Sequence, residues 1–354
     1  MSQMQLGLLA IGAIVLLAVV LYNQWNTRKN APRRSLTKTE DAAAANSEPS
    51  FEQPGVERVE PVFGALGGED PTAMTAATVA KLGQLDPLID AVAGMGLEHV
   101  VSGDAVLAAL PTTRRVGTKL FTVEGLNAAT KVWEAPVAGQ RYSALQAGVQ
   151  LANRLGPLNE IEFSEFVMKV QQFADALQAN PDFPEMMQEV ARARELDQFA
   201  SAHDAQLGFT VRARRASWSP GYLTQHAAAQ GFVAGVLPGR MVLPSSQLGG
   251  APVLVLQYET QAALADDPEQ SALREFQLSL DVPHVPRSEQ PYQRMCEVAV
   301  ALAQTMEGVV TDGSEQALSE DFMQGITVDL DKLYNALAQR ELDAGSALAR
   351  RLFS

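Results

Sequence analysis

The pattern of apolar positions changes along this chain, and it starts with one continuous block. Residues 6–22 are all apolar apart from glycine and a final tyrosine, and no charged residue occurs between Met1 and Thr27. At ~1.5 Å per helical residue the block spans roughly 26 Å, which matches the hydrocarbon core of a bilayer once its uncharged neighbours are added. The pattern predicts an N-terminal transmembrane helix.

Basic residues follow this block, and none precedes it. They are Arg28, Lys29, Arg33, Arg34 and Lys38. A cleaved signal peptide, which is the alternative, has its positive charge before the apolar run. Because basic flanks stay in the cytoplasm, we expect a single-pass membrane protein with a very short N-terminus outside and a cytoplasmic body.

The next segment, residues 28–84, predicts a disordered linker. Residues 40–71 carry eight acids and a single base, Arg58, so the segment buries too little apolar surface to offset its chain entropy. Val59, Val62 and Phe63 either dock on the folded part or are solvated residues of the linker. The folded body would therefore hang from the membrane on a flexible tether.

From about residue 85 the apolar positions alternate between strand and helix periods. In the first half we expect strands at 88–97, 119–126 and 142–152, and helices at 104–110, 160–177 and 183–202. The helix at 160–177 has the clearest start, because Asn159 is followed three residues later by Glu162 in a capping-box arrangement.

The second half repeats this order of elements. We expect strands at 207–214, 240–244, 252–260, 275–283 and 308–311, and helices that start at Pro220, at Pro291 and after Ser319. The interpretation is an α+β fold with two similar halves, each an antiparallel sheet covered by helices on one face. The expected domains are 1–27 (anchor), 28–84 (linker), 85–205 (first half), 206–342 (second half) and 343–354 (tail). In that tail the turns at 347–353 are interpreted as a fraying end, with a membrane contact as the alternative.

Composition reduces the classes of partner that the chain is expected to bind. The formal net charge is -14 and the pI is about 4.8, so phosphate backbones would repel the body and nucleic acid is not expected as a partner. One cysteine, Cys296, excludes an internal disulfide and fits a reducing compartment. We expect it to be an inert core thiol.

Catalytic and cofactor signatures are missing. The four histidines stand far apart with no ligand spacing, so no metal site is expected. Gly94 and Gly96 lack the third glycine of a dinucleotide fingerprint, and no Walker motif occurs. We therefore expect no cofactor, no small-molecule substrate and no enzyme.

The strand at 253–256 is apolar at every position, whereas a sheet with one wet face should alternate. An apolar helix-free face is a surface on which a peptide can lie. The alternative is that this face packs against the other half of the duplication. The sequence leaves both open.

The second half resembles the C-terminal domain of the ZipA-type cell division proteins over roughly residues 205–342. The motifs are residues 230–235 (QGFVAG) and 308–312 (GVVTD), with the strands at 252–260 and 278–283 between them. The anchor, basic collar and acidic linker also follow the family order. The resemblance implies a single-pass protein of the cell inner membrane with a periplasmic N-terminus, located at the division septum. It also implies that the cytoplasmic domain binds the C-terminal tail of the division GTPase FtsZ, anchors and bundles its filaments at the membrane, and helps recruit later division proteins.

The resemblance places the tail peptide on the helix-free face. By register it implies these partner-binding residues: Thr210, Arg212, Leu256, Tyr258, Thr260 and Ser279. Ser279 stands where the family has an aromatic ring, and Glu315 and Gln316 stand where it has a basic residue. A membrane-tethered adaptor with another peptide partner is the alternative function, and residues 85–205 are either structural support or a second binding site.

Overall fold

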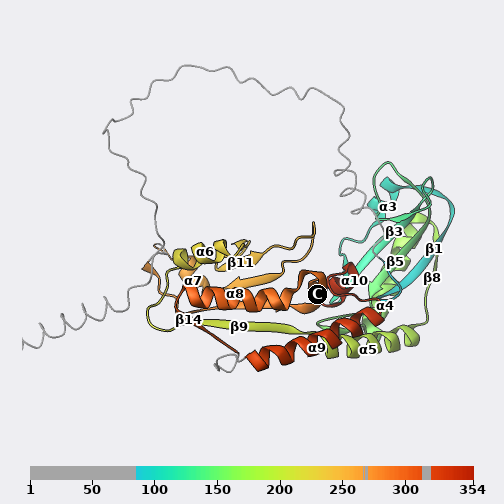
Figure 1. Cartoon of the computed structure of the whole chain (residues 1–354). Helices are drawn as coiled ribbons and strands as arrows, with labels where there is room; N and C mark the ends of the chain where they lie inside the picture. Colours follow the sequence, from blue (N-terminus) through green and yellow to red (C-terminus); the bar gives the residue numbers. More distant parts are fainter. Residues whose placement is uncertain (1–84, 266, 268–269, 313–319) are drawn as a thin grey trace, which may run out of the picture. The chain divides into compact units, whose positions relative to one another are not determined.

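The computed structural model describes residues 85–265, 267, 270–312 and 320–354 (Figure 1). The predicted membrane helix, the linker and the Ser319 cap lie outside the described residues. Among the helices of the described ranges, none has the length and apolar character needed to cross a membrane. The described residues form two compact units: a first unit of residues 85–151 and 158–192, and a second unit of residues 152–157 and 193–354.

The first unit is built on an antiparallel six-stranded sheet with the order β2-β3-β5-β1-β8, and β4 pairs with β3. Its strands are β1 (Asp90–Ser102), β2 (Arg115–Val116), β3 (Lys119–Asn127), β4 (Trp133–Glu134), β5 (Arg141–Gln150) and β8 (Ala179–Asp182). Its helices are α3 (Gly103–Ala109), α4 (Glu160–Leu177) and the start of α5 (Met186–His203). Alternate strand residues are buried, and the Phe121 ring lies edge-on to Phe166 of α4 at 6.2 Å.

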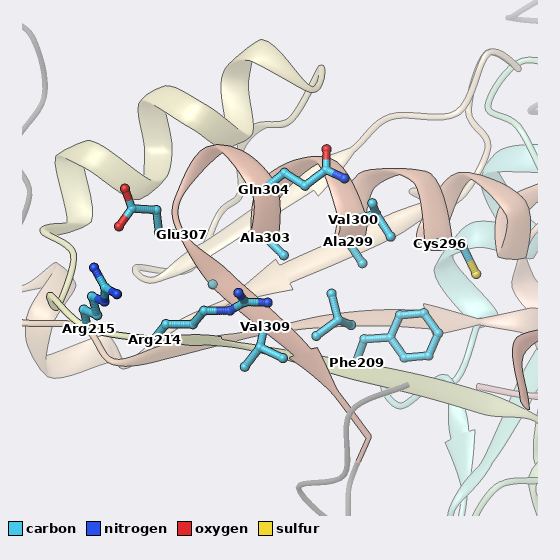
Figure 2. Close-up of a pocket in the computed structure, with 12 residues that line it drawn as sticks. Phe209, Arg214, Arg215, Cys296, Ala299, Val300, Ala303, Gln304, Glu307 and Val309 are labelled. Atoms are coloured by element: carbon cyan, nitrogen blue, oxygen red, sulfur yellow. The ribbon is translucent and has the colours of Figure 1, made fainter. Parts of the chain in front are cut away.

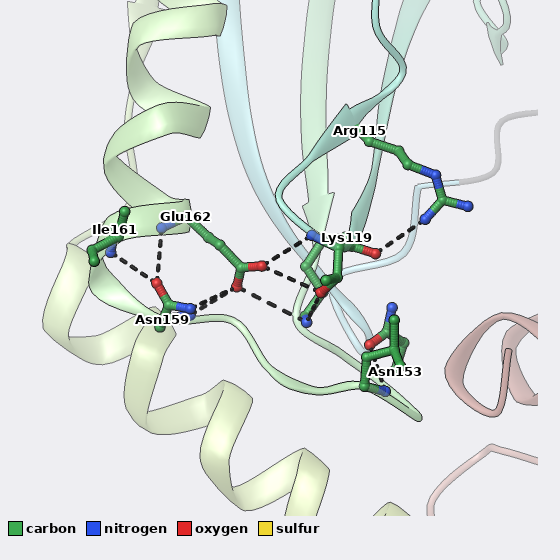
Figure 3. Close-up of polar contacts among 8 residues, drawn as sticks. Arg115, Lys119, Asn153, Asn159, Ile161 and Glu162 are labelled. Carbon is green, nitrogen blue, oxygen red and sulfur yellow. Dashed lines mark hydrogen bonds and ion pairs between the residues drawn. The ribbon is translucent and has the colours of Figure 1, made fainter.

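A buried polar cluster joins the start of α4 to β3 (Figure 3). Asn159 and Glu162 form the predicted capping box, since the Asn159 side chain accepts from the Glu162 amide at 2.9 Å and the Glu162 carboxylate accepts from the Asn159 amide at 3.3 Å. The same carboxylate accepts from the Thr118 amide at 3.1 Å and lies 3.9 Å from the Lys119 ammonium. Lys119 is only 1% exposed, so Glu162 both caps the helix and balances a buried charge.

The second unit is built on another antiparallel six-stranded sheet, with the order β10-β11-β12-β13-β9-β14. Its strands are β9 (Gln206–Ala213), β10 (Val233–Ala234), β11 (Arg240–Leu243), β12 (Leu254–Gln257), β13 (Glu275–Asp281) and β14 (Gly308–Thr311), and a hairpin joins β6 (Ala152–Asn153) to β7 (Gly156–Pro157). Its helices are α6 (Pro220–Ala229), α7 (Thr260–Ala263), α8 (Pro291–Thr305), α9 (Glu320–Gln339) and α10 (Ala347–Leu352), with short 3-10 turns η2 (Val282–His284) and η3 (Arg287–Glu289).

One hydrophobic core lies between this sheet and its helices. Alternate residues of β9, β11, β12 and β13 pack there with residues of α6, α8 and α9. Trp218 is fully buried at the centre, where its indole N–H donates to the Met306 carbonyl at 2.8 Å and its ring lies 5.7 Å from Phe276. As the sequence predicts, Ser219 caps α6 and Pro220 occupies its first turn. The helices thus cover one face of the sheet.

The two sheets share one strand order, which agrees with the predicted repeat. In the first, β2, β3, β5, β1 and β8 are neighbours, and in the second β11, β12, β13, β9 and β14 follow the same order. In the first sheet β5 pairs antiparallel with β1, the first strand of its half, and in the second β13 pairs antiparallel with β9, the first strand of the other half. Strand β9 of the second unit is therefore the counterpart of β1.

Arg154 ties the β6–β7 hairpin to the second unit. Its guanidinium donates to Asp204 at 2.6 and 2.8 Å and to Asp281 at 2.8 Å through two nitrogens. These hydrogen bonds raise the pKa of Arg154, with the bond to Asp281 as the largest cause. A hairpin that lies between first-half elements in the sequence is thus a part of the second unit.

Two expectations differ from the structure. Strand β12 ends at Gln257, and Thr260 begins the short helix α7 instead of extending the strand. The chain end is not frayed: Ser346 caps α10, and Leu352 and Phe353 are at most 1% exposed. The Phe353 carbonyl also lies 3.0 Å from His284 Nε2. Tertiary burial therefore orders a helix too short to be stable alone.

Replacing Glu162 by glutamine should destabilise the first unit by about 3 kcal/mol, because the charge beside buried Lys119 is lost. Faster hydrogen exchange of the β3 and α4 amides in the variant would measure this loss of stability. Glu165→Gln is the matched control on the same helix. Its partner Lys169 is 3.4 Å away and Glu165 is 43% exposed, so its loss should cost less than about 1 kcal/mol. Equal effects of the two substitutions would contradict this role.

Glu289 should make the second unit sensitive to acid. Its buried carboxylate accepts from the Ser246 hydroxyl at 2.5 Å, from the Ser246 amide at 2.8 Å and from Ser245 at 2.9 Å. The hydrogen bond from the Ser246 hydroxyl is the largest cause that lowers the Glu289 pKa, and the Arg294 charge adds to it. Since folding lowers this pKa, the carboxylate stabilises the fold above its ordinary pKa and ceases to do so as pH falls through the lowered value.

As the pH falls from about 7 to about 3, the free energy of unfolding should therefore decrease less in Glu289→Gln than in the wild type. Urea midpoints measured at both pH values check this, with Glu297→Gln on α8 as an exposed control. A parallel fall of the midpoints in wild type and Glu289→Gln would rule out this carboxylate as a source of acid sensitivity.

Candidate functional site

The helix-free face of the second sheet is formed by the strand residues that alternate with its core. Strand pairing places them in rows across the sheet. One row is Gly208, Ser279, Val255 and Val242; the next is Thr210, Gln277, Gln257 and Arg240; a third is Arg212 and Glu275 with Val309. All of these residues are exposed or half-buried. They form a broad surface on central strands, and we refer to it as the helix-free face.

The structure brings together three of the predicted partner-binding residues. Thr210 and Arg212 on β9 and Ser279 on β13 lie on the helix-free face. Leu256 does not: it is 0% exposed and belongs to the core on the opposite side of the sheet. The expectation that Leu256 lies on this face is wrong, because its neighbours Met241 and Leu278 across the strands are core residues too.

The other two predicted residues lie beyond the end of β12. Tyr258 packs against the core from its edge, and burial raises the pKa of its hydroxyl. Thr260 is the first residue of α7. Both line a cavity of about 610 Å³ together with Glu275 and Gln277, so they border the helix-free face without being part of it.

The helix-free face is more polar than the sequence predicts. Arg212 and Glu275 form an ion pair at 2.7 Å, and the Ser279 hydroxyl donates to the Val255 carbonyl at 3.4 Å. Its apolar centre is the cross-strand pair Val242 and Val255, which the sequence reasoning missed. The period-2 spacing of Val255 from Gln257 was the signal that could have found it.

A second candidate surface lies between α8 and the edge strand β14 (Figure 2). It is a groove of about 640 Å³, which we call the α8 groove. Ala299 and Ala303 of α8 form one wall, and Phe209 and Val310 form the other. Three exposed charged residues stand at one end: Arg214, Arg215 and Glu307. The groove therefore combines an apolar lining with two positive charges and one negative charge.

A third cavity, of about 610 Å³, lies between α8 and α9. It shares Cys296 with the α8 groove and is lined by Tyr292 and Tyr334. Burial raises the pKa of the Cys296 thiol, and burial also raises the pKa of Tyr334 to about 12. None of these groups is activated as a nucleophile or a base at neutral pH.

Possible metal ligands do not converge within the described part of the chain, where no group of three or more His, Cys, Asp or Glu residues could hold an ion. The histidines there make local contacts: His203 stacks on Phe199 with ring centroids 4.2 Å apart, and His284 lies 3.5 Å from Asp281.

A sheet covered by helices on one face, with a broad free face of central strands, defines a two-layer module of the α+β class. Residues 264–327, which include β13, α8 and β14, match the family described as ZipA, C-terminal FtsZ-binding domain. The match supports a ZipA-type cell division protein, and the family is one of protein-binding domains, not of enzymes. A search of curated proteins gave no significant match to the chain.

Proposed function

We propose that this chain is a membrane-anchored scaffold of cell division whose second unit binds the C-terminal tail of FtsZ on the helix-free face. The observation that carries the proposal is the family match over 264–327, because it covers β13, which contributes Gln277 and Ser279 to that face. The free face of the neighbouring strands supports the same site.

The geometry of the face suggests how a tail peptide would be held. The Val242–Val255 pair offers a small apolar seat, and Arg212 at one side offers a guanidinium to a carboxylate. Glu275 competes for that guanidinium, so the net gain from one acidic contact is small. Single contacts of this kind predict weak binding.

Weak binding is sufficient for a tethered scaffold. A filament presents many tails to many anchored copies, and effective concentration then raises the overall affinity by orders of magnitude. We propose that the apolar run at 6–22 provides the anchor and the basic residues after it keep the body in the cytoplasm. Anchoring, filament bundling and recruitment of later division proteins at the septum would follow from this arrangement.

Another candidate is a membrane-tethered adaptor that binds a different peptide in the α8 groove. The specific observation in its favour is the combination of an apolar lining with Arg214 and Arg215, which suits a peptide that is both acidic and apolar. Since the groove lies on the helix-covered side of the sheet, the two sites can be separated by mutation.

Replacing Gly208 by phenylalanine should weaken binding of an FtsZ tail peptide about tenfold or more, or ~1.4 kcal/mol. Among the described residues, a Cβ at Gly208 meets only the Leu278 carbonyl, at 4.0 Å, so the ring can be added without disrupting the sheet. The ring would cover the row of Ser279 and Val255. Fluorescence anisotropy of a labelled tail peptide, titrated with the full-length chain, measures the change. The first-unit counterpart, Gly94→Phe, is the matched control and should leave the affinity unchanged.

Unchanged affinity in Gly208→Phe would mean that the peptide binds at another site. If Gly208→Phe binds as the wild type does while the double variant Arg214→Glu/Arg215→Glu loses affinity, the peptide occupies the α8 groove. Digestion of the body by protease added outside intact spheroplasts would overturn the cytoplasmic orientation. If Gly208→Phe keeps both its affinity for the tail peptide and its midcell localisation, the proposed site is contradicted.

A further inference from the structure

The cavity between α8 and α9 has a buried, largely apolar floor. Its volume of about 610 Å³ is typical of small-molecule sites, which range from about 300 to about 1,000 Å³. The floor is formed by four buried residues, two from the start of α8 and two from α9: Pro291, Tyr292, Leu330 and Tyr334. The last three are at most 8% exposed. We call this site the α9 cavity.

The described rim of the α9 cavity is polar and has no net charge. The Arg287 guanidinium donates to the Asp331 carboxylate at 2.7 Å, and the other rim residues, Gln290, Gln293 and Thr327, are exposed and uncharged. A charged ligand would have to compete with this ion pair or bury its own charge on the floor, where desolvation is costly. The rim therefore favours an uncharged ligand.

The floor contains a hydrogen-bond donor that has no acceptor. Tyr334 is 8% exposed, and its buried hydroxyl has no hydrogen-bond partner among the described residues. Burial raises the pKa of this hydroxyl to about 12, and the nearby charges of Arg287 and Asp331 have smaller effects on it. The Arg287 guanidinium also lies 5.7 Å from the centre of the Tyr334 ring. The hydroxyl thus lies near the rim ion pair, stays protonated at neutral pH and can donate.

The other hydroxyl of the floor already has a partner. Tyr292 is hydrogen-bonded to the Cys296 thiol, and its ring lies edge-on to Phe209 with centroids 6.3 Å apart. Tyr292 therefore offers a ring to a ligand, whereas Tyr334 offers a ring and a donor. A buried hydroxyl without a partner is unfavourable, and an acceptor oxygen on a ligand would remove that cost.

We propose that the α9 cavity binds an uncharged aromatic molecule that carries one carbonyl oxygen. The rings of the ligand pack on the floor against Tyr292 and Leu330, because aromatic groups prefer offset and edge-on contacts with other rings. Its carbonyl accepts from the Tyr334 hydroxyl. A further polar group would be buried without a partner, so one acceptor fits best. The inference goes beyond FtsZ binding, because α8 and α9 pack on the side of the sheet opposite the helix-free face.

Binding of benzophenone to the full-length chain tests the proposal, since this uncharged ketone has two rings and one carbonyl. The chain has six tyrosines, and carbon-13 in their rings gives each one an NMR signal. Benzophenone should shift the signals of Tyr292 and Tyr334 saturably and leave that of Tyr142, in the first unit, unchanged. No saturable shift of Tyr292 and Tyr334 up to the solubility limit of benzophenone would overturn the proposal.

Tyr334→Phe tests the hydrogen bond, because it removes only the hydroxyl. With the Tyr292 signal as the reporter, affinity for benzophenone should fall about fivefold. Affinity for diphenylmethane, which has the same two rings and no carbonyl, should not change. Each comparison uses one probe in two variants, so uptake of the probe by lipid cancels. An equal effect of Tyr334→Phe on the two probes, or none on either, would overturn the proposal.

The urea midpoint shows whether Tyr334→Phe acts only on binding. The variant loses a hydroxyl that has no partner, so its midpoint should not fall below that of the wild type. A lower midpoint would show that the hydroxyl is paired within the fold, and would overturn the proposal.

Two tryptophan variants locate the ligand, which is necessary because Cys296 lines both the α9 cavity and the α8 groove. Leu330→Trp fills the floor and should abolish benzophenone binding. Val300→Trp, on the wall of the α8 groove, is the matched control and should leave it unchanged. The reverse pattern would place the ligand in the α8 groove and overturn the proposal. If hydrogen exchange of the β9 and β13 amides shows that Leu330→Trp is unfolded, Tyr334→Phe decides the question.

The FtsZ tail peptide, added to the same labelled chain, separates this inference from the proposed function. The peptide should leave the Tyr292 and Tyr334 signals unchanged. If the peptide shifts both signals and benzophenone shifts neither, a partner side chain occupies the cavity and the inference is wrong. A failure of tail binding with normal benzophenone binding would contradict the proposed function alone.

Discussion

One-sided burial of the second sheet is the constraint on which the rest of this structure depends. Alternate residues of β9, β11, β12 and β13 enter a single core with α6, α8 and α9, centred on Trp218 and Phe276. Because successive side chains of a strand point to opposite faces, each residue that packs in the core places the next residue of the strand on the other face. The free face, which is the proposed site of protein binding, is therefore a consequence of the core, and its composition follows from the register.

The same arrangement occurs twice, and the two copies have diverged on their free faces. The second sheet presents Thr210, Gln277 and an Arg212–Glu275 ion pair, whereas the first presents Gly94 and Gly96 on β1 and has Leu85 over Gly148 on β5. A polar face with a small apolar seat suits a weak, exchangeable peptide. The repeat thus gives one scaffold two different surfaces.

Local signals predicted the element starts, while long-range contacts decided the rest. The Asn159–Glu162 capping box and the Ser219–Pro220 start lie within a few residues and are confirmed. The sequence reasoning placed Leu256 on the wrong face because the run 253–256 is apolar throughout, so its pattern does not show which residues face the core. The pairing of β12 with β11 and β13 shows that Leu256 does. The order of α10 and the seat of Leu85 over Gly148 depend likewise on residues distant in sequence, so no local pattern reveals them.

The central claim is that an FtsZ tail binds the helix-free face of the second sheet, and amide chemical-shift mapping tests it most directly. An unlabelled tail peptide is titrated into the isotope-labelled chain. The account predicts shifts concentrated on β9, β12 and β13, including Thr210, Val255 and Ser279. Shifts confined to α8 and β14, with these strand residues unchanged, would contradict it.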